Sequence, residues 1–271
     1  MMFGMIRVMM RPQPSDGFVW VQAAGGPALV CGPLRPLADH LFTTREWALG
    51  SGAGSDDEWA PVAASLGVDL NHLVRLRQVH GSAVVVRRAG DPLPSGTRPE
   101  ADIVVSNDPL VAVAIQTADC VPLLIADSRT GAVAAAHAGW RGLAASVPTA
   151  AVSALARAFD ARPKDLVVAV GVSISAPSYE VGPDVAERFT AAGFGSEPLA
   201  RWFSEGEREG RWQFDGWQAA ADQLAAAGVP AGQIHGAGLC TAAYPALFCS
   251  YRRDATGAGR MAAAIRCRAT R

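Results

Sequence analysis

The chain has 271 residues, of which 50% are hydrophobic and 18% are charged, and its formal net charge is −1. This composition excludes a disordered chain and predicts a sizeable hydrophobic core. The basic residues are nearly all arginines and are spread along the sequence without a basic block. The sequence therefore excludes an extended electrostatic surface for nucleic acid, and we expect small-molecule ligands.

The cysteine content and the hydropathy pattern indicate the cellular compartment in which the protein is expected. The chain has five cysteines, an odd number at irregular spacing: Cys31, Cys120, Cys240, Cys249 and Cys267. A chain of this size needs no disulfide staples. No apolar run approaches the roughly 18 residues of a membrane-spanning helix, and residues 1–10 lack the cleavage site of a signal peptide. We expect a cytoplasmic protein in which residues 1–17 are a disordered or frayed extension and residues 18–271 form a single domain.

Short apolar runs, separated by glycine, proline and charged segments, predict the secondary structure in chain order. A hairpin is expected over 18–31, and a glycine-rich loop at 50–57 precedes a helix over 58–66 that Asp57 caps. Further strands are predicted at 73–79, 83–88, 102–106, 110–116, 121–126, 131–137, 166–172, 234–237, 247–251 and 261–267. Further helices are predicted at 143–159, 183–192 and 215–227. Because strands outnumber helices and occur in runs, the pattern favours α+β layers over a doubly wound parallel sheet.

Three short motifs carry the residues best suited to chemistry. They are Gln78-Val79-His80-Gly81, Ala118-Asp119-Cys120, and the run Ala136-His137-Ala138-Gly139-Trp140-Arg141-Gly142. Side chains alternate along a strand, so His80 and His137 each share a face with apolar residues and are expected at the ends of buried strands. A thiolate and two imidazoles suit zinc and leave a fourth coordination position open. A buried histidine and a buried free cysteine without metal are also common, and the spacing alone leaves both interpretations open.

These motifs occur with five other segments in order from about Leu41 to Ile265. The segments are Phe42-Thr43-Thr44-Arg45, Tyr179-Glu180-Val181-Gly182, Leu239-Cys240-Thr241, Ser250-Tyr251-Arg252-Arg253-Asp254 and Thr256-Gly257-Ala258-Gly259-Arg260. Together they closely resemble the YfiH-type family, whose members are also called laccase-domain proteins, purine nucleoside phosphorylases of the multicopper-oxidase-like type, or peptidoglycan editing factors. The sequence departs from the family pattern at Leu41, at Gly171-Val172 and in the 50–54 loop, where Gly, Gly-Pro and an Asn-Leu-Gly segment are usual.

The resemblance implies a single catalytic domain with α/β/β/α layers and mixed sheets. It also implies that His80, Cys120 and His137 hold zinc, which copper can displace in vitro because copper binds nitrogen and sulfur ligands more tightly. The implied activity is phosphorolysis of adenosine, guanosine and inosine, with adenosine deaminase and methylthioadenosine phosphorylase activities alongside. We expect a nucleoside and phosphate as partners, with no nucleic acid or membrane, and a monomer or a weak homo-oligomer.

Other residues of these motifs are candidates for catalysis and substrate binding. A guanidinium can chelate phosphate in a fork, although a surface or structural ion pair is the commoner role of any one arginine. Trp140 could stack on a purine or belong to the core. Asp119 could orient a ligand histidine or cap a turn. The candidate catalytic residues are therefore Arg45, Cys120, Asp119 and Arg141, and the candidate substrate-binding residues are Trp140, Arg252 and Arg260.

Four other functions are weighed from the residues alone. With Cys120 as nucleophile and His137 or His80 as base, the same atoms would form a cysteine hydrolase or amidase. A zinc amidase acting in peptidoglycan precursor editing is the related alternative. A copper-dependent polyphenol oxidase needs more histidines than the five present, three of which lie outside the motifs. A non-catalytic binding module would leave the open ligand position without a role.

Overall fold

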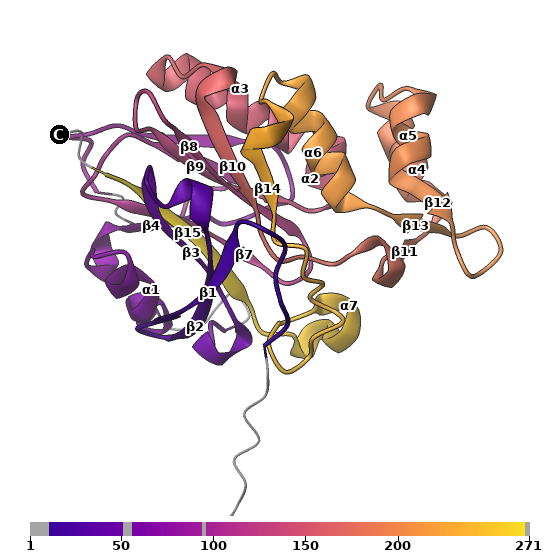
Figure 1. Cartoon of the computed structure of the whole chain (residues 1–271), viewed down its shortest axis with the longest axis horizontal. Coiled ribbons are helices and arrows are strands. Elements are labelled where there is room, and N and C mark those ends of the chain that lie inside the picture. Colours follow the sequence, from indigo (N-terminus) through magenta and orange to yellow (C-terminus); the bar gives the residue numbers. More distant parts are fainter. Residues whose placement is uncertain (1–10, 51–55, 94–95, 269–271) are drawn as a thin grey trace, which may run out of the picture.

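Two six-stranded sheets packed face to face form the centre of the computed structural model, which describes residues 11–50, 56–93 and 96–268 (Figure 1). The first sheet has the strand order β1 (Phe18–Ala23), β2 (Gly26–Cys31), β3 (Ala38–Thr43), β15 (Met261–Cys267), β7 (Ala112–Thr117) and β4 (Leu73–Arg75). The second has the order β14 (Ile234–Gly236), β10 (Leu166–Val170), β8 (Val121–Asp127), β9 (Val133–Ala138), β6 (Ile103–Ser106) and β5 (Val84–Arg87). The pairs β4–β7, β10–β14 and β5–β6 are parallel and the other pairs are antiparallel. The α+β fold with mixed sheets that the sequence predicts is confirmed.

Helices cover the outer face of each sheet and complete an α/β/β/α layer order (Figure 1). The helices α2 (Trp140–Ala144), α3 (Val147–Phe159) and α6 (Gly216–Ala226) pack on the second sheet, and α1 (Ala60–Ser65) packs on the first. The strands β8 and β9 are therefore buried along their whole length. Their sequences are continuous apolar runs without alternation because both faces of each strand are covered.

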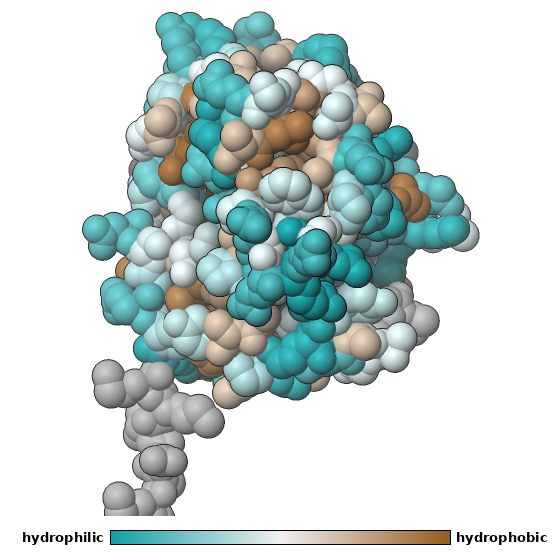
Figure 2. Space-filling view, turned by 90° about the vertical axis from the view of Figure 1, so that its right-hand side faces the viewer, coloured by the Kyte–Doolittle hydropathy of each residue, from teal (hydrophilic) through white to brown (hydrophobic). Residues whose placement is uncertain are grey.

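A third, three-stranded sheet lies beside the two large sheets and carries two helices, at the right of Figure 1. Its strand order is β11 (Glu180–Val181), β13 (Trp212–Phe214) and β12 (Phe203–Glu205), and its helices are α4 (Pro183–Ala191) and α5 (Ser196–Trp202). The ring of Phe189 lies 5.3 to 5.7 Å from the rings of Phe194, Trp202, Phe203 and Phe214. This aromatic cluster is continuous with the core between the second sheet and its helices, so the small sheet extends that core. The face of the molecule on this side is mostly hydrophilic, apart from a hydrophobic patch near its upper centre (Figure 2).

Several predicted elements differ from the structure for local reasons. The helix predicted over 143–159 is broken into α2 and α3 at Ser146, whose φ is +57°, and Pro148 occupies the first turn of α3. Asp57 lies inside a 3-10 turn, Asp56–Trp59, instead of capping the helix that follows, so that prediction is wrong. The strand predicted at 247–251 is also wrong, because this segment leads into the short helix α7 (Tyr251–Asp254). The predicted loop at 50–57 lies largely outside the described residues, since 51–55 are not described.

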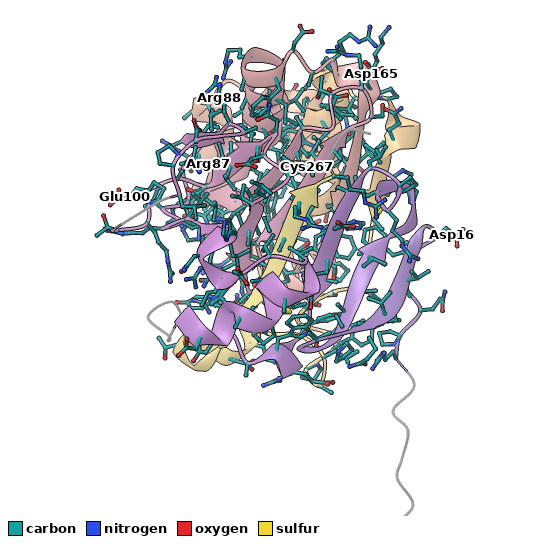
Figure 3. All side chains as sticks on the ribbon, turned by 90° about the vertical axis from the view of Figure 1, so that its left-hand side faces the viewer. Asp16, Arg87, Arg88, Glu100, Asp165 and Cys267 are labelled. Carbon is teal, nitrogen blue, oxygen red and sulfur yellow. The ribbon has the colours of Figure 1, made fainter. Side chains whose placement is uncertain are left out.

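The described part of the predicted extension, residues 11–17, makes hydrogen bonds to the sheets. The indole nitrogen of Trp20 donates to the carbonyl of Pro12 at 2.9 Å, and the amide of Ser15 donates to the carbonyl of Ala237 at 3.0 Å. The prediction for residues 1–10 lies outside the described residues. All five cysteines are free thiols, and Cys267, in the centre of Figure 3, is buried at the end of β15. In the described part of the chain no helix is both long enough and apolar enough to span a bilayer.

Candidate metal centre

His80, Cys120 and His137 come together from three separate segments of the chain. His80 lies in the loop after β4, Cys120 in the turn between β7 and β8, and His137 near the end of β9. Their potential ligand atoms all lie within 4.8 Å of one another. A tetrahedral zinc ion separates such nitrogen and sulfur ligands by about 3.3 to 3.7 Å, so small side-chain adjustments would let all three reach one ion. The donor set therefore fits zinc and leaves one coordination position for a substrate or water.

A buried carboxylate, Asp102, supports two of the three candidate ligands. One of its oxygens lies 2.8 Å from Nδ1 of His137, which leaves Nε2 of that ring for a metal ion. The same carboxylate accepts three backbone N–H groups of the loop that carries His80: Val79 at 3.2 Å, His80 at 3.1 Å and Gly81 at 2.7 Å. Burial opposes ionisation of Asp102, but these hydrogen bonds outweigh it and hold its pKa below the usual range. Such a carboxylate fixes the tautomer and the orientation of a metal-binding histidine.

Asp119 is a candidate for this orienting role in the sequence, with a turn cap as the alternative, whereas in the structure the carboxylate that contacts His137 is that of Asp102. The signal that could have found Asp102 is its position just before the apolar strand β6, which pairs with the strand of His137. The backbone confirms this neighbourhood, because the amide of His137 donates to the carbonyl of Asp102 at 2.8 Å. Asp102 and His137 are thus joined through both main chain and side chain.

His137 lies near the end of a buried strand, as predicted, but His80 does not. β4 ends at Arg75, and His80 is an exposed residue with a φ of +60°. Its loop is held by Gln78, whose side chain donates to the carbonyl of Gln116 at 2.9 Å and accepts from the Gln116 amide at 2.7 Å. The Gln78 amide thereby occupies the hydrogen-bonding positions of a neighbouring strand at the edge of β7. A left-handed backbone costs a histidine little, since His is among the residues enriched there.

The electrostatics of the site favour a thiolate at Cys120. Burial raises the pKa of this thiol, but the charge and hydrogen bonds of His137 and His80 outweigh burial and lower it to about 6. Burial likewise lowers the pKa of His137, while the Cys120 thiolate and the Asp102 carboxylate raise it to about 9. Since a thiolate is the form that binds metal, Cys120 is poised as a ligand near neutral pH.

Gly139 allows the main chain to pass close to the cluster. A Cβ atom at this position would lie 2.7 Å from Sγ of Cys120 and 3.3 Å from Cδ2 of His80. Any larger residue would displace the sulfur, so the glycine of the His-Ala-Gly-Trp-Arg-Gly motif is required by the candidate ligands themselves.

A cavity of about 1370 Å³ opens over the three candidate ligands. Most of the predicted site residues line it: Cys120, Asp119, Trp140, Arg141, Arg252 and Arg260, together with Tyr179 and Tyr251. Another part of the wall is formed by Glu100, which lies at the left edge of Figure 3 and pairs with Arg77 at 2.9 Å. Arg45 is the exception, because it lies outside this lining and its guanidinium donates to the carbonyl of Pro245.

Three arginines of the lining are held in place by contacts with aromatic rings and backbone carbonyls, none of which neutralises their charge. The guanidinium of Arg141 lies over the ring of Trp140 at 4.1 Å, and that of Arg252 lies over the ring of Tyr179 at 4.9 Å. Arg252 also donates to the carbonyl of Glu180 at 2.6 Å, and Arg260 donates to the carbonyls of Ala258 and Gly259. Among the described residues none of the three pairs with a carboxylate. The cavity therefore offers forked cationic donors to an anion.

Comparison with known proteins is consistent with the motifs and the fold. The family described as multi-copper polyphenol oxidoreductase laccase matches residues 56–268. The chain is 40% identical to a purine nucleoside phosphorylase of Deinococcus radiodurans over 240 residues, which cover 83% of this chain and 88% of that protein. It is 38% identical to the purine nucleoside phosphorylase YfiH of Escherichia coli over 192 residues, 71% of this chain and 72% of that one.

Two solved structures share the fold over nearly the whole chain. The hypothetical protein YfiH of Bacillus licheniformis superposes with a TM-score of 0.83 at 25% identity, covering 93% of this chain and 100% of that one. YlmD of Geobacillus stearothermophilus superposes with a TM-score of 0.80 at 28% identity, covering 93% of this chain and 99% of that one. With the three motifs, the two-sheet fold and these relatives in agreement, the chain belongs to the YfiH-type, laccase-domain family.

Proposed function

We propose that the protein is a zinc-dependent purine nucleoside phosphorylase. The observation that carries this proposal is the cluster of His80, Cys120 and His137 beneath a cavity whose wall presents three arginines without carboxylate partners. The relatives named purine nucleoside phosphorylase support the same activity. We propose adenosine, guanosine and inosine as substrates, with adenosine deaminase and methylthioadenosine phosphorylase activities alongside.

Phosphorolysis breaks the bond between the purine nitrogen and C1′ of the ribose and forms a bond between C1′ and a phosphate oxygen. When bound by the three ligands, zinc supplies a Lewis acid that polarises a substrate oxygen or nitrogen. Arg141, Arg252 and Arg260 have the forked geometry that chelates a phosphate dianion and holds it in place for attack. The cavity is larger than the roughly 300 to 1,000 Å³ of a typical ligand site, so it has room for a nucleoside and phosphate together.

The remaining parts of the proposal concern the whole protein. We propose that residues 18–271 form one catalytic domain and that the protein works in the cytoplasm as a monomer or weak homo-oligomer, without nucleic acid or membrane. We propose zinc as the resident metal, with copper able to displace it in vitro because copper binds nitrogen and sulfur ligands more tightly.

A second candidate is a thiol hydrolase or amidase in which Cys120 attacks the substrate. The observation that favours it is the lowered pKa of Cys120 beside His137, because a thiolate next to an imidazole is the usual arrangement of a cysteine nucleophile. This enzyme would need no metal. A zinc amidase acting on peptidoglycan precursors would need the metal but no phosphate.

Metal analysis combined with an inosine cleavage assay distinguishes these candidates. The phosphorylase should contain one zinc per chain and cleave inosine only when phosphate is present. Cys120→Ser, His80→Ala and a chelator should each remove zinc and activity together, because a serine hydroxyl is a poor ligand for zinc. Cys267→Ser, the same change at a buried thiol between the two sheets, should keep both. Full activity in metal-free protein, or rapid alkylation of Cys120 that stops turnover without loss of metal, would favour the thiol enzyme instead.

A further inference from the structure

The carboxylate of Asp119 joins the metal centre to a distant segment of the chain. One oxygen accepts the hydroxyl of Thr241 at 2.5 Å. The other accepts the hydroxyl of Ser250 at 3.1 Å and the backbone N–H of Arg252 at 2.6 Å. Asp119 is only 8% exposed, and Cys120 follows it directly in the chain. The 241–252 segment is therefore tied to the residue beside a candidate metal ligand.

These contacts argue against proton transfer by Asp119. A general acid or base must lie within hydrogen-bonding reach of the proton that it moves. Both oxygens of Asp119 are instead occupied by donors of the protein, one of which is a backbone amide that cannot reverse its polarity. Its φ of +87° lies in the left-handed region, which aspartate adopts more readily than most residues other than glycine, and the contacts of both oxygens hold this backbone in place.

The 241–252 segment carries two residues of the cavity wall, Tyr251 and Arg252. It is stiff within itself, because Arg253 donates to the carbonyls of Thr241 and Phe248 at 3.1 and 2.9 Å. The hydroxyl of Ser250 also accepts the amide of Arg253 and so caps α7. The three hydrogen bonds to Asp119 connect this segment to the side of the cavity that carries the candidate metal ligands.

We infer that Asp119 is a positioning residue that holds Arg252 and Tyr251 at a fixed place beside the metal centre. This inference rests on the proposed function for its substrate, phosphate, because Arg252 is one of the phosphate-binding candidates. The role is distinct from that of Asp102, which holds the candidate ligands themselves. Asp119 sets where the bound anion lies relative to those ligands.

An asparagine at this position separates positioning from proton transfer. In one orientation its oxygen accepts from Ser250 and the Arg252 amide, while its NH2 group faces Thr241, whose hydroxyl can accept instead of donate. Asp119→Asn should therefore keep the tie, whereas Asp119→Ala loses all three hydrogen bonds. A group that transfers a proton would be disabled by both changes.

The experiment compares Asp119→Asn, Asp119→Ala and Ser250→Ala in zinc-loaded protein. Asp119→Ala should raise the KM for phosphate about tenfold or more, with a smaller change in kcat, unchanged zinc content and faster hydrogen exchange across 241–252. Ser250→Ala, which removes one donor to Asp119 together with the N-cap of α7, should raise that KM by less than Asp119→Ala and keeps the comparison usable if Asp119→Ala folds poorly. Asp119→Asn should match the wild type in KM, kcat and exchange.

Either of two results would overturn the inference. One is an inactive Asp119→Asn protein with normal exchange in 241–252, which would make Asp119 a reacting group. The other is Asp119→Ala with normal exchange and a normal KM for phosphate, which would show that the tie does not position Arg252. Because hydrogen exchange does not depend on turnover, a wild-type protein that fails to cleave inosine would refute the proposed function while the exchange arm still decides the role of Asp119.

Discussion

Replacing Asp102 with Asn is expected to weaken zinc binding and to loosen the loop that carries His80. Both oxygens of Asp102 accept backbone N–H groups, from His80 at one oxygen and from Val79 and Gly81 at the other. An asparagine amide in either orientation directs its NH2 group at one of these donors, and a backbone donor cannot become an acceptor. The substitution therefore has no orientation that preserves the network.

The size of the effect follows from the bonds that each orientation loses. With the NH2 group toward Val79 and Gly81, bonds of 3.2 and 2.7 Å are lost. In the other orientation the 3.1 Å bond to His80 is lost, and the 2.8 Å contact to His137 survives only if the ring proton moves from Nδ1 to Nε2, the atom that would bind the metal. A buried donor left without an acceptor costs about 1 to 3 kcal/mol, so the substitution costs at least about that much. Losing the carboxylate behind a ligand histidine lowers metal affinity by about 10- to 100-fold.

Competition with a chromophoric zinc chelator measures the affinity, and thermal unfolding of the metal-free protein measures the stability. Asp119→Asn is the matched control, since it makes the same change at another carboxylate beside a candidate ligand but retains an orientation that satisfies its partners. Its zinc affinity should stay within about threefold of the wild type. An Asp102→Asn protein that is folded and binds zinc as tightly as the wild type would refute the argument that Asp102 organises the ligand set.

Three further predictions concern a ligand contact, the cavity wall and the core. Gly139→Ala should lower zinc affinity at least about tenfold without unfolding the protein, because the new Cβ would lie 2.7 Å from the Cys120 sulfur. The control is Gly232→Ala, whose new Cβ would meet no atom within 4 Å and which should bind zinc normally in the same chelator assay. Tyr251 lies in the cavity lining and is 55% exposed, so its ring is free to stack on a purine. Tyr251→Ala should raise the KM for inosine roughly fivefold through lost stacking, whereas Tyr251→Phe, which keeps the ring, should not. Equal KM values for the wild type and both variants would exclude stacking at this residue. Burial lowers the pKa of His40 to about 4, so at this residue the unfolded chain binds more protons than the folded chain between pH 6.5 and 4. His40 should therefore contribute about 3 kcal/mol to the stability that the metal-free protein loses across that range. Urea unfolding should show that His40→Gln loses less stability than the wild type between pH 6.5 and 4. If the free energy of unfolding of the two proteins falls in parallel with pH, His40 does not titrate in this way.

Most strands of the two large sheets could be predicted from the sequence, including the three-residue β4 and β14, whereas the buried strand β3 and the strands of the third sheet could not. β8, β9 and β15 are mostly apolar runs, with a polar residue only at or near the end of each, because each is covered on both faces, and such runs are visible without any tertiary information. The strands β11, β12 and β13 have two or three residues each, too few for a periodic pattern. Two of these strands carry rings, Phe203 and Phe214, that pack on Phe189 of α4, a contact between elements that no local pattern encodes.

The candidate ligands could be identified from the motifs, but the groups that hold them could not. His137 lies where the run of small apolar residues predicts it. The place of His80 depends on Gln78 pairing with the edge of β7, a contact across 38 residues that no local pattern encodes. The role of Asp102 depends on the register of β6 against β9, and the partners of Asp119 lie 122 to 133 residues away in the chain. Residue type identified the candidate metal ligands. The packing of distant segments decides that Asp102 contacts His137 and that Asp119 contacts the 241–252 segment.

The histidine count and placement argue against multicopper oxidation, although the family carries the laccase description. Reduction of oxygen to water takes four electrons, and a multicopper oxidase stores them on several copper ions with many histidine ligands. In the described part of the chain only His80, Cys120 and His137 form a group that could hold a metal. His40 cannot join them, because its Nε2 accepts the Cys31 amide at 2.9 Å and its Nδ1 lies 3.2 Å from the Ala38 carbonyl. Copper loaded into the protein should therefore occupy one site per chain and yield no oxygen uptake with a phenol substrate. Sustained oxygen consumption by protein containing one copper per chain would contradict this conclusion.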